Sequence, residues 1–447
     1  MSEAAAVGRF RSTAREILAA VVTFSAMSYI LCVQPALMSG EMAGTPTGMN
    51  TGALLTTTCL VSAFGCFLMG FWARYPFALA PGMGENFFTV LGVMPLCAAL
   101  LNKPMGEAAV WQLALGVVFI SGLLFLLLTL LGVRTFLIRA VSPSLKTAFG
   151  VGIGLFIADL GLKNAGFYQI IENQPKLGTM ASWDMAIFFL GLIVSVVLTS
   201  RRVPGAILIG MFTSAMLALA VGKIHYTGLI GLPNDPSPVM GKMDLSGVIR
   251  HLPALLPSFL ILCFMDVFDT FGTVVGIGQK AGMMKDGTLP RCERVFAADA
   301  LATLFGALGG QSTVTSFLES AAGVESGGRT GLTAVLVGVF FLLSLFFTPN
   351  VLADGGCASV TAAAALVFVG MLMMQGVGEI EWSDPTEALP AFVIIAGIPL
   401  TQSIADGIIF GLILWPILKL LTGRARDVAW PLYPTAILLI AYAVFVH

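Results

Sequence analysis

Four acidic residues lie inside runs of apolar sequence, and they are the strongest candidates for chemistry in this chain. They are Glu85, Asp266, Asp269 and Glu319. A charge at the centre of a bilayer costs roughly 2.5–3.5 kcal/mol on insertion scales, so such residues are kept where they pair, face a wet cavity or bind a ligand. The four carboxylates therefore predict a buried polar site.

The spacing of two of these acids predicts a shared surface. Asp266 and Asp269 stand three residues apart in CFMDVFDTFGT, which places both on one face of a helix, about 5–6 Å apart. Two carboxylates this close repel each other when both are ionised, so they are candidates to carry a proton. The alternative is that either residue only caps or bridges helices. Asp159, Asp299 and Asp406 stand near span ends and are predicted as caps or loop-facing pairs.

Two interrupted segments are expected to hold the site. In PFALAPGMGENFFTV (76–90), Pro81 and Gly82 disfavour a continuous helix, which predicts an extended piece over 77–80 and a helix that starts near Gly82 to Gly84. In QSTVTSFLESAAG (311–323), residues 313–315 predict a second extended piece, with Glu319 at the start of a second half-helix. Half-helix N-termini offer N–H donors and a positive dipole end to a polar ligand.

Further candidates flank these segments. Gly84 and Glu85 open the first half-helix, and Asn86 adds an amide with donors and an acceptor. Phe268, beside the paired acids, is a candidate stacking partner for a flat ligand. The alternative for both segments is that Pro and Gly only kink helices for packing.

The composition requires lipid as the solvent. Of 447 residues, 57% are hydrophobic and 11% are charged, whereas a soluble chain carries about a quarter charged residues. A net charge of −1 gives no field that attracts nucleic acid. The seven cysteines include no CxxC pair, so we expect no disulfide framework, no metal site and no cofactor. The three histidines lie outside the apolar runs, so proton chemistry would rest on carboxylates.

Long apolar runs predict an all-α polytopic membrane protein with 14 transmembrane segments. A spanning helix needs about 20 apolar residues. Runs of that kind cover 16–38, 51–72, 108–131, 137–158, 184–200, 203–222, 254–278, 292–309, 329–348, 355–375 and 402–421. Shorter or interrupted runs cover 77–97, 313–328 and 387–400. The additional C-terminal apolar segment, 430–446, is either a further span or an interfacial helix.

Basic residues predict the orientation. Three arginines precede the first run, and Lys or Arg follows the second, fourth, sixth, eighth and fourteenth runs, whereas loops 39–50 and 349–354 contain neither. Because cytoplasmic loops are enriched in Lys and Arg, we expect a multi-pass protein of the cell membrane with its N-terminus in the cytoplasm. The segments RRVPGAILIG (201–210) and LTQSIADGIIFG (400–411), together with the two interrupted runs at an odd offset of seven, suggest an inverted repeat.

Several long motifs resemble the AzgA-like purine permeases of the nucleobase–ascorbate transporter group. They are TFSAMSYILCVQPALMS (23–39), FALAPGMGENFF (77–88), FMDVFDTFGTVVGIGQKAGM (264–283), TSFLESAAGVESGGRTGLTA (315–334) and PAFVIIAGIPLTQSIADGIIFG (390–411). The resemblance covers roughly 16–421. Three positions depart from the family pattern, namely Gln34, Glu85 and Gln311, and these bear on which base is preferred.

The resemblance implies two inverted repeats of seven spans. A core domain would comprise 16–131 and 254–348, and a gate domain 137–222 and 355–421, often within a homodimer. It implies proton-coupled uptake of adenine, guanine or hypoxanthine. The family's binding positions carry over onto Asn86, Asp266, Asp269 and Glu319.

The leading hypothesis is a purine–proton symporter in the lipid bilayer that works by an elevator-like movement. Glu319 is the predicted main substrate acceptor, and Asp266 a second contact and part of the proton link. Asp269 would tune the site or pair helices, and Asn86 would orient the base or support Glu319. One alternative is an anion carrier, or a xanthine or uracil carrier, of the same fold. Another is an intramembrane enzyme, but no HExxH or GxSxG motif is present, so we predict no enzyme and no catalytic residues.

Overall fold

The protein is mostly helical in a computed structural model that describes residues 3–131, 141–171, 174–224, 230–284, 289–352, 359–430, 432–434, 436–437 and 439–440. Within these residues, eight helical segments are long and apolar enough to cross a membrane by length and composition. They are Thr13–Met38, Thr51–Ala73, Met83–Leu101, Ala108–Leu130, Pro143–Asn164, Trp183–Ser200, Leu252–Val274 and Ala362–Glu379. The predicted class, an α-helical multi-pass membrane protein, fits this architecture.

The elements follow in an order that alternates long helices with short breaks. The first part contains α1 (Glu3–Met27), α2 (Ile30–Met38), α3 (Thr51–Phe67), the π-helical turn η1 (Leu68–Ala73), β1 (Leu79–Pro81), α4 (Met83–Phe88), the π-helical turn η2 (Thr89–Val93), α5 (Met94–Leu101), α6 (Ala108–Leu130), α8 (Pro143–Asn164), β2 (Tyr168–Ile171), β3 (Gln174–Leu177), α9 (Trp183–Ser200) and α10 (Ala206–Ala220). The second part contains α11 (Leu245–Arg250), α12 (Leu252–Lys280), α13 (Cys292–Leu308), β4 (Val314–Ser316), α14 (Ser320–Glu325), α15 (Gly331–Leu352), α16 (Ser359–Met373), η3 (Met374–Glu379), α17 (Pro385–Thr401), α18 (Ile404–Leu421) and η4 (Ala425–Asp427).

Polar side chains fix where several helices begin. Asn50 accepts a hydrogen bond from the Ala53 N–H at 2.8 Å at the start of α3, and Ser142 accepts from the Leu145 N–H at 3.3 Å at the start of α8. Such caps satisfy N–H groups that have no partner within the helix. The predicted span 137–158 therefore becomes a helix that begins at Pro143, and its first residues, 137–140, lie outside the described residues.

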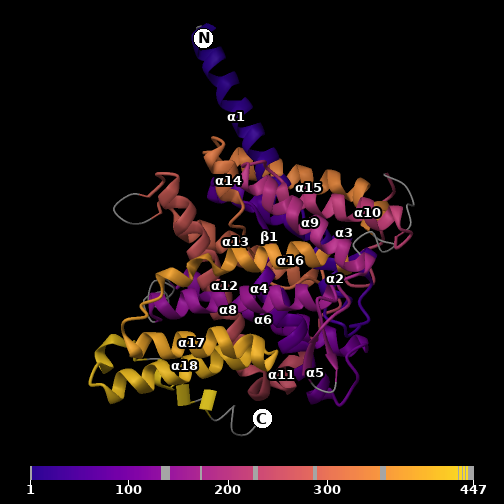
Figure 1. Cartoon of the computed structure of the whole chain (residues 1–447). Coiled ribbons are helices and arrows are strands. Elements are labelled where there is room, and N and C mark those ends of the chain that lie inside the picture. Colours follow the sequence, from indigo (N-terminus) through magenta and orange to yellow (C-terminus); the bar gives the residue numbers. More distant parts are fainter. Residues whose placement is uncertain are drawn as a thin grey trace.

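Two strands meet at the centre of the fold. β1 pairs antiparallel with β4, with Leu79 opposite Ser316 and Pro81 opposite Val314. The Gly82 N–H donates to the Thr313 carbonyl at 2.9 Å, just before α4 begins. β1 lies among the helices near the middle of the molecule (Figure 1). The two predicted extended pieces are confirmed, each displaced by one or two residues along the chain, and irregular backbone is tolerated here because it is buried in protein.

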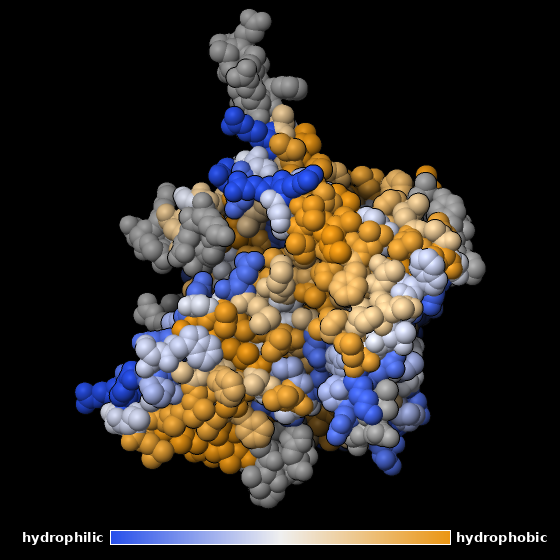
Figure 2. Space-filling model, viewed as in Figure 1, coloured by the Kyte–Doolittle hydropathy of each residue, from blue (hydrophilic) through white to orange (hydrophobic). Residues whose placement is uncertain are grey.

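The helices pack in layers around this central pair of strands. α8 packs against α16 and α17, α3 against α15, and α6 against α13. α1 extends beyond the rest of the fold at its N-terminal end (Figure 1). Hydrophobic side chains cover much of the face formed by α9, α10 and α15, and also that of α17 and α18 (Figure 2). An apolar exterior of this kind is what a lipid environment requires.

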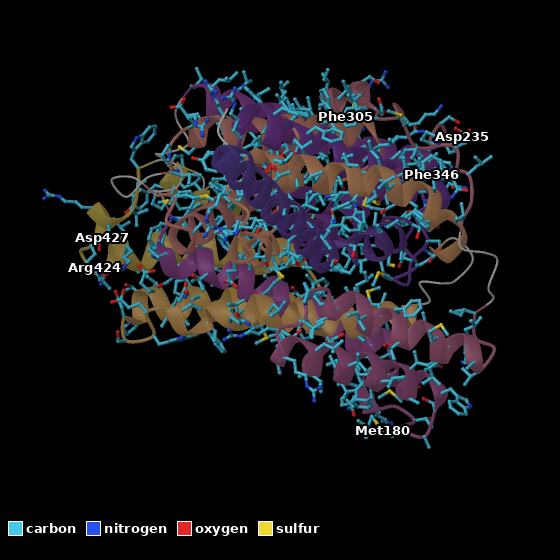
Figure 3. The ribbon with its side chains drawn as sticks, turned by 90° about the horizontal axis from the view of Figure 1, so that it is seen from above. Met180, Asp235, Phe305, Phe346, Arg424 and Asp427 are labelled. Carbon is cyan, nitrogen blue, oxygen red and sulfur yellow. The ribbon has the colours of Figure 1, made fainter. Side chains whose placement is uncertain are left out.

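The polar loops lie at opposite sides of the molecule. Asp235 is exposed on one side, and Arg424 and Asp427 form an ion pair of 3.0 Å on the other (Figure 3). Most of the predicted C-terminal segment 430–446 lies outside the described residues.

One predicted helix cap is wrong. Asp299 is completely buried in the middle of α13, where its carboxylate accepts a hydrogen bond from the Thr270 hydroxyl of α12 at 2.7 Å. Asp299 stands in the first half of the predicted span 292–309, and the sequence did not show what its side chain would face. In the fold it faces α12, so this acid bridges two helices. Asp159, by contrast, forms the predicted loop-facing pair by accepting from the Tyr168 hydroxyl at 2.9 Å.

Candidate substrate site

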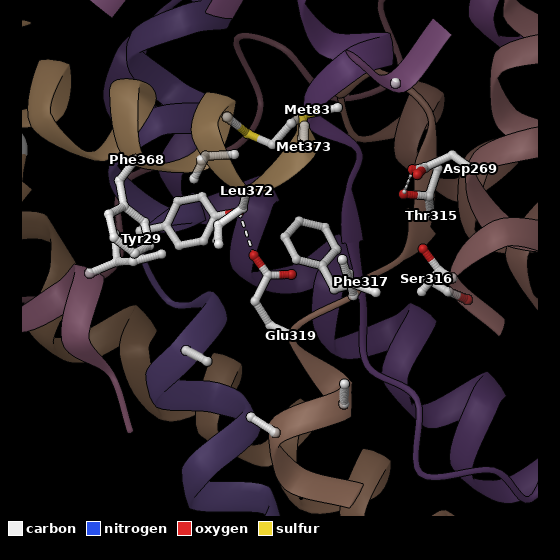
Figure 4. A pocket seen from close by; sticks show the side chains of 18 of the residues that line it. Tyr29, Met83, Asp269, Thr315, Ser316, Phe317, Glu319, Phe368, Leu372 and Met373 are labelled. Atoms are coloured by element: carbon white, nitrogen blue, oxygen red, sulfur yellow. Dashed lines mark hydrogen bonds between the residues drawn. The ribbon is translucent and has the colours of Figure 1, made fainter. Parts of the chain in front are cut away.

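A large cavity opens beside the two paired strands. Its volume is about 1260 Å³, and its lining comes from α1, the α1–α2 junction, α4, α8, α12, β4, α14, α16 and the α9–α10 turn. Figure 4 shows part of this lining, with Tyr29, Phe317, Glu319 and Phe368 around one region and Asp269 with Thr315 in another. Segments far apart in the sequence therefore meet at one hollow.

Glu319 is an acid of the cavity lining with a defined hydrogen-bond partner. It lines the cavity immediately before α14, and its Oε1 accepts a hydrogen bond from the Tyr29 hydroxyl at 2.8 Å. Tyr29 lies in the two-residue turn between α1 and α2, and its backbone keeps right-handed helical φ and ψ angles. Figure 4 draws this Tyr29–Glu319 hydrogen bond as a dashed line.

Asp269 forms a second polar position in the same cavity. Its Oδ2 accepts a hydrogen bond from the Thr315 hydroxyl of β4 at 3.1 Å, and its side chain is exposed to the cavity. Helix α12 supplies Asp269 and strand β4 supplies Thr315, so the pair joins two separate segments. A carboxylate held in this way can accept hydrogen bonds from N–H groups of a ligand.

Gly84 and Glu85 bring a third carboxylate to the lining from the first turn of α4. Gly84 is close to α8, because a Cβ atom there would lie 3.4 Å from Ile153 Cδ1. Gly82 precedes them, and a Cβ atom there would lie 2.4 Å from Glu85 Oε2. The glycine thus gives the Glu85 side chain the space in which it lies.

Asn86 and Asp266, two other predicted site residues, lie outside the cavity lining. Asn86 is completely buried, donates to Gln34 Oε1 and accepts from the Ser312 hydroxyl. Asp266 is 1% exposed, one turn from Asp269 on α12. The side chain of Phe268, the predicted stacking partner, lies outside the described residues.

Sequence reasoning missed several residues that line the cavity. Tyr29 stands in an apolar run as one of only 6 tyrosines, and a buried phenol seeks a hydrogen-bond partner, which was the available signal. Lys146 and Arg202 also line the cavity, although neither was among the site candidates named from the sequence. Lys146 lies inside the predicted span 137–158, where a basic residue was an available signal, and Arg202 stands in a basic loop that indicated only the membrane boundary.

The described residues contain no group of three or more His, Cys, Asp or Glu side chains suited to a metal ion. The carboxylates of the cavity are instead spread over α4, α12 and the start of α14. Such a set, with a tyrosine hydroxyl and aromatic walls, is the kind of lining that is typical of a site for a polar organic molecule in a membrane transport protein.

Comparison with known proteins agrees with that class. The model of the Permease family, Xan_ur_permease, matches residues 14–410, and the chain belongs to this family. The chain is 37% identical to the adenine permease AdeP of Escherichia coli over 97% of its own length and 94% of the relative's. It is 39% identical to the guanine/hypoxanthine permease PbuG of Bacillus subtilis, covering 96% of both chains. The resemblance to purine permeases is thus confirmed, and the protein is a transport protein rather than an enzyme.

A solved structure shares the fold. The transmembrane domain of the cyanobacterial bicarbonate transporter BicA superposes with a TM-score of 0.63 at 16% sequence identity, covering 90% of this chain and 98% of that domain. At this identity the likeness concerns the fold alone. It identifies the arrangement of helices with that of a known transporter domain.

Proposed function

We propose that this protein is a secondary active transporter that imports purine nucleobases, such as adenine, guanine or hypoxanthine, together with protons. The observation that carries the proposal is the Tyr29–Glu319 pair at the edge of a large cavity, with Asp269 and Glu85 on the same lining. The ring N–H groups of a purine donate to carboxylates, and such charge-assisted hydrogen bonds are strong. The relatives named above are adenine and guanine/hypoxanthine permeases.

The aromatic walls of the cavity suit a flat ring. Phe317 and Phe368 both line it, from the β4–α14 segment and from α16 (Figure 4). Aromatic rings favour offset or edge contacts with other rings. We propose that a purine binds between these side chains with its N–H edge toward Glu319, the main acceptor, while Asp269 tunes the site.

The distribution of the lining supports movement of a core against a gate. Tyr29, Glu85 and Glu319 come from segments assigned to the core, 16–131 and 254–348, and Phe149 and Phe368 from segments assigned to the gate, 137–222 and 355–421. A ligand held between two bodies can be carried when one slides past the other. We propose an elevator-like mechanism in 14 spans built as two inverted repeats, within a homodimer.

Proton coupling is assigned to Glu319 and Asp266. Glu319 faces the cavity, where a ligand and a proton compete for the same oxygens. Asp266 lies one turn from Asp269 on α12, so it can respond to charge at the cavity without touching the ligand. Asn86 would support the site from the protein side, where its amide is already hydrogen-bonded.

Uptake into proteoliposomes tests the function. Labelled adenine, guanine and hypoxanthine should accumulate inside vesicles when the exterior is more acidic, and an uncoupler should abolish accumulation but not equilibration. A sodium gradient of equal size is the control. Absence of uptake of every purine, with protein verified in the vesicles, would refute the proposal, and accumulation driven only by sodium would refute proton coupling.

One observation favours an anion as the second candidate cargo. Lys146 and Arg202 line the cavity, and the fold is shared with a bicarbonate transporter domain. Substitution Glu319→Gln separates the two cases. It should lower purine uptake at least tenfold, because an amide replaces a charged acceptor, whereas bicarbonate or sulfate uptake should stay or increase. Xanthine and uracil in the same assay test the other nucleobases.

A further inference from the structure

A chain of buried polar side chains lies behind the candidate site. We call it the amide relay and define it as Ser312, Asn86, Gln34, Gln311 and Thr57. Each of these residues is at most 1% exposed, and none is among the residues that line the cavity. Buried amides are costly unless their hydrogen bonds are satisfied, so the arrangement of this chain calls for a physical reason.

Every link of the amide relay runs in one direction. The Ser312 hydroxyl donates to Asn86 Oδ1, and Asn86 Nδ2 donates to Gln34 Oε1. Gln34 Nε2 donates to Gln311 Oε1 at 2.8 Å. Gln311 Nε2 then donates to Thr57 Oγ1 at 2.7 Å and to the backbone carbonyl of Leu54 at 2.9 Å.

The carbonyl at the end of the relay fixes this direction. A backbone carbonyl can only accept, so Gln311 must present its nitrogen to Leu54 and its oxygen to Gln34. Gln34 must then present its nitrogen to Gln311 and its oxygen to Asn86, and the same logic orients Asn86 toward Ser312. No single amide can turn over without placing two acceptors or two donors against each other.

The amide relay joins the segments that carry the cavity residues. Asn86 lies on α4, two residues after Gly84, and Ser312 lies three residues before Thr315 of β4. Gln34 lies on α2, and Thr57 lies on α3. Two segments 226 positions apart in the sequence are therefore held to one another and to α2 and α3 behind the cavity.

We propose that the amide relay is a positioning device that sets the affinity for substrate without contacting it. By fixing α4 against β4, it fixes the places from which Glu85 and Thr315 reach the cavity. Gln34 and Gln311 are the two halves of one contact, a hydrogen bond of 2.8 Å. The transport readout of this proposal rests on the proposed function.

Three methionine variants test the coupling, because methionine matches glutamine in length but makes no strong hydrogen bond. Gln34→Met leaves both Asn86 Nδ2 and Gln311 Oε1 without their partners in the relay. Gln311→Met leaves Gln34 Nε2 without its acceptor. In the double variant, the two glutamine groups that faced each other are both gone, and Asn86 Nδ2 has lost its partner. Thr57 Oγ1 and the Leu54 carbonyl lose the donor from Gln311 but keep their own hydrogen bond at 3.2 Å.

The measurement is the KM for each transported base, with protein level and unfolding temperature recorded for every variant. We expect each single variant to raise KM about tenfold, as an orphaned buried polar group does. The double variant should be no worse than Gln34→Met, and every base should be affected by the same factor. Ser62→Ala, a buried change on α3 outside the relay, is the matched control and should leave KM unchanged.

Two results would overturn the proposal. One is that the two single effects multiply to about a hundredfold in the double variant. The other is that unfolding temperatures fall while KM stays constant, which is the signature of packing alone. If the wild-type protein takes up no base, the proposed function fails separately. The relay is then judged on the unfolding temperatures of the wild type, the two single variants and the double variant. If the losses of the single variants add in the double variant, the proposal is overturned; if the double variant loses less than their sum, it is supported.

Discussion

A carboxylate inside a membrane protein needs a donor, and Tyr29 supplies one to Glu319. The hydroxyl lies 2.8 Å from Oε1 and fixes one oxygen of the acid at the edge of the cavity. The acid is thereby oriented before a ligand arrives, which lowers the cost of ordering the site on binding.

Removing the Tyr29 hydroxyl should therefore weaken substrate binding. We expect Tyr29→Phe to raise the KM for purine uptake about tenfold, the size of one hydrogen bond to a charged group. The ring remains, so the expressed level should not change. Tyr75→Phe is the matched control, because its hydroxyl donates to the Pro290 carbonyl away from the cavity lining. Equal KM values for the two variants would contradict the role of Tyr29.

Single residues also show what the sequence could and could not indicate. An acid in an apolar run is conspicuous, so Glu85, Asp269 and Glu319 were found, and all three line the cavity. Asp299 was misjudged because its burial depends on how α12 and α13 pack, with Thr270 as partner. In the sequence, Lys146 and Arg202 stand far apart and show no sign of a common site. Only the folded structure shows that both line the cavity.

Among the elements, the extended segments that become β1 and β4 were each predictable, because Pro81 and the run of Thr and Val residues disfavour a helix. The pairing itself was not predictable, since it joins residues more than 200 positions apart. Helix ends were displaced by a few residues wherever a cap such as Ser142 decided the first turn. The residue types along the chain thus predicted where the helices are interrupted, whereas contacts between distant segments decide what each interruption pairs with.

Adding a Cβ atom to Gly82, in the turn between β1 and α4, should displace side chains of the candidate site. In Gly82→Ala the new Cβ would lie 2.4 Å from Glu85 Oε2 and 2.9 Å from Thr315 Oγ1. Both side chains can move, so stability should change little, but the cavity wall is displaced. We expect purine uptake to fall about tenfold, as small misplacements do. Gly378→Ala, where a Cβ meets nothing within 4 Å, should leave uptake unchanged; equal losses would contradict the prediction.

A second element-scale feature is an ion cluster that ties α17 to α18. Lys419 is 1% exposed and lies 2.9 Å from Glu387 Oε1 and 3.4 Å from Asp384 Oδ2. Glu387 also accepts from Ser142 at 2.5 Å and from the Trp415 indole at 3.0 Å. One buried cation therefore serves two acids, and the cluster reaches the start of α8.

Removing that cation should destabilise the fold. Lys419→Met is expected to reduce the free energy of unfolding by about 3–5 kcal/mol, because it leaves buried charge uncompensated. Unfolding in detergent followed by fluorescence would measure the loss. Lys103→Met removes the partner of an exposed ion pair with Glu107 and should cost less than about 1 kcal/mol. Similar losses in both variants would show that the cluster adds nothing.

The pH dependence of this cluster follows from Asp384. Hydrogen bonds from Thr386, and then the Arg424 and Lys419 charges, hold the pKa of Asp384 below its ordinary value. A depressed carboxyl pKa contributes stability above the unfolded pKa of about 3.9 and loses it as the pH falls further. The loss caused by Asp384→Asn should thus be constant near neutral pH and shrink in unfolding experiments below about pH 4. A loss that grows with acidity would contradict this sign.

At the scale of the whole molecule, one opening of the cavity should face the cytoplasm. Arg202 is exposed, lines the cavity and belongs to a basic turn. Asp235 is exposed on the loop between α10 and α11, which follows seven predicted spans and is therefore expected outside if the N-terminus is cytoplasmic. With Cys292 and Cys357 replaced by serine, Arg202→Cys should react with a membrane-impermeant maleimide only in inside-out vesicles. Asp235→Cys, the control, should react only in right-side-out vesicles.

Substrate should change the rate at which maleimide labels Arg202→Cys, but not the rate at which it labels Asp235→Cys. If the core moves against the gate, a purine shifts the population of states in which the cavity is open to the cytoplasm. Labelling of Arg202→Cys should then change severalfold when a transported purine is added, an effect of population rather than of new contacts. Labelling of Asp235→Cys should remain constant because its loop lies outside the cavity lining. If substrate does not change the labelling rate of Arg202→Cys, the prediction of a moving carrier is contradicted, and a rigid pore would describe the protein better.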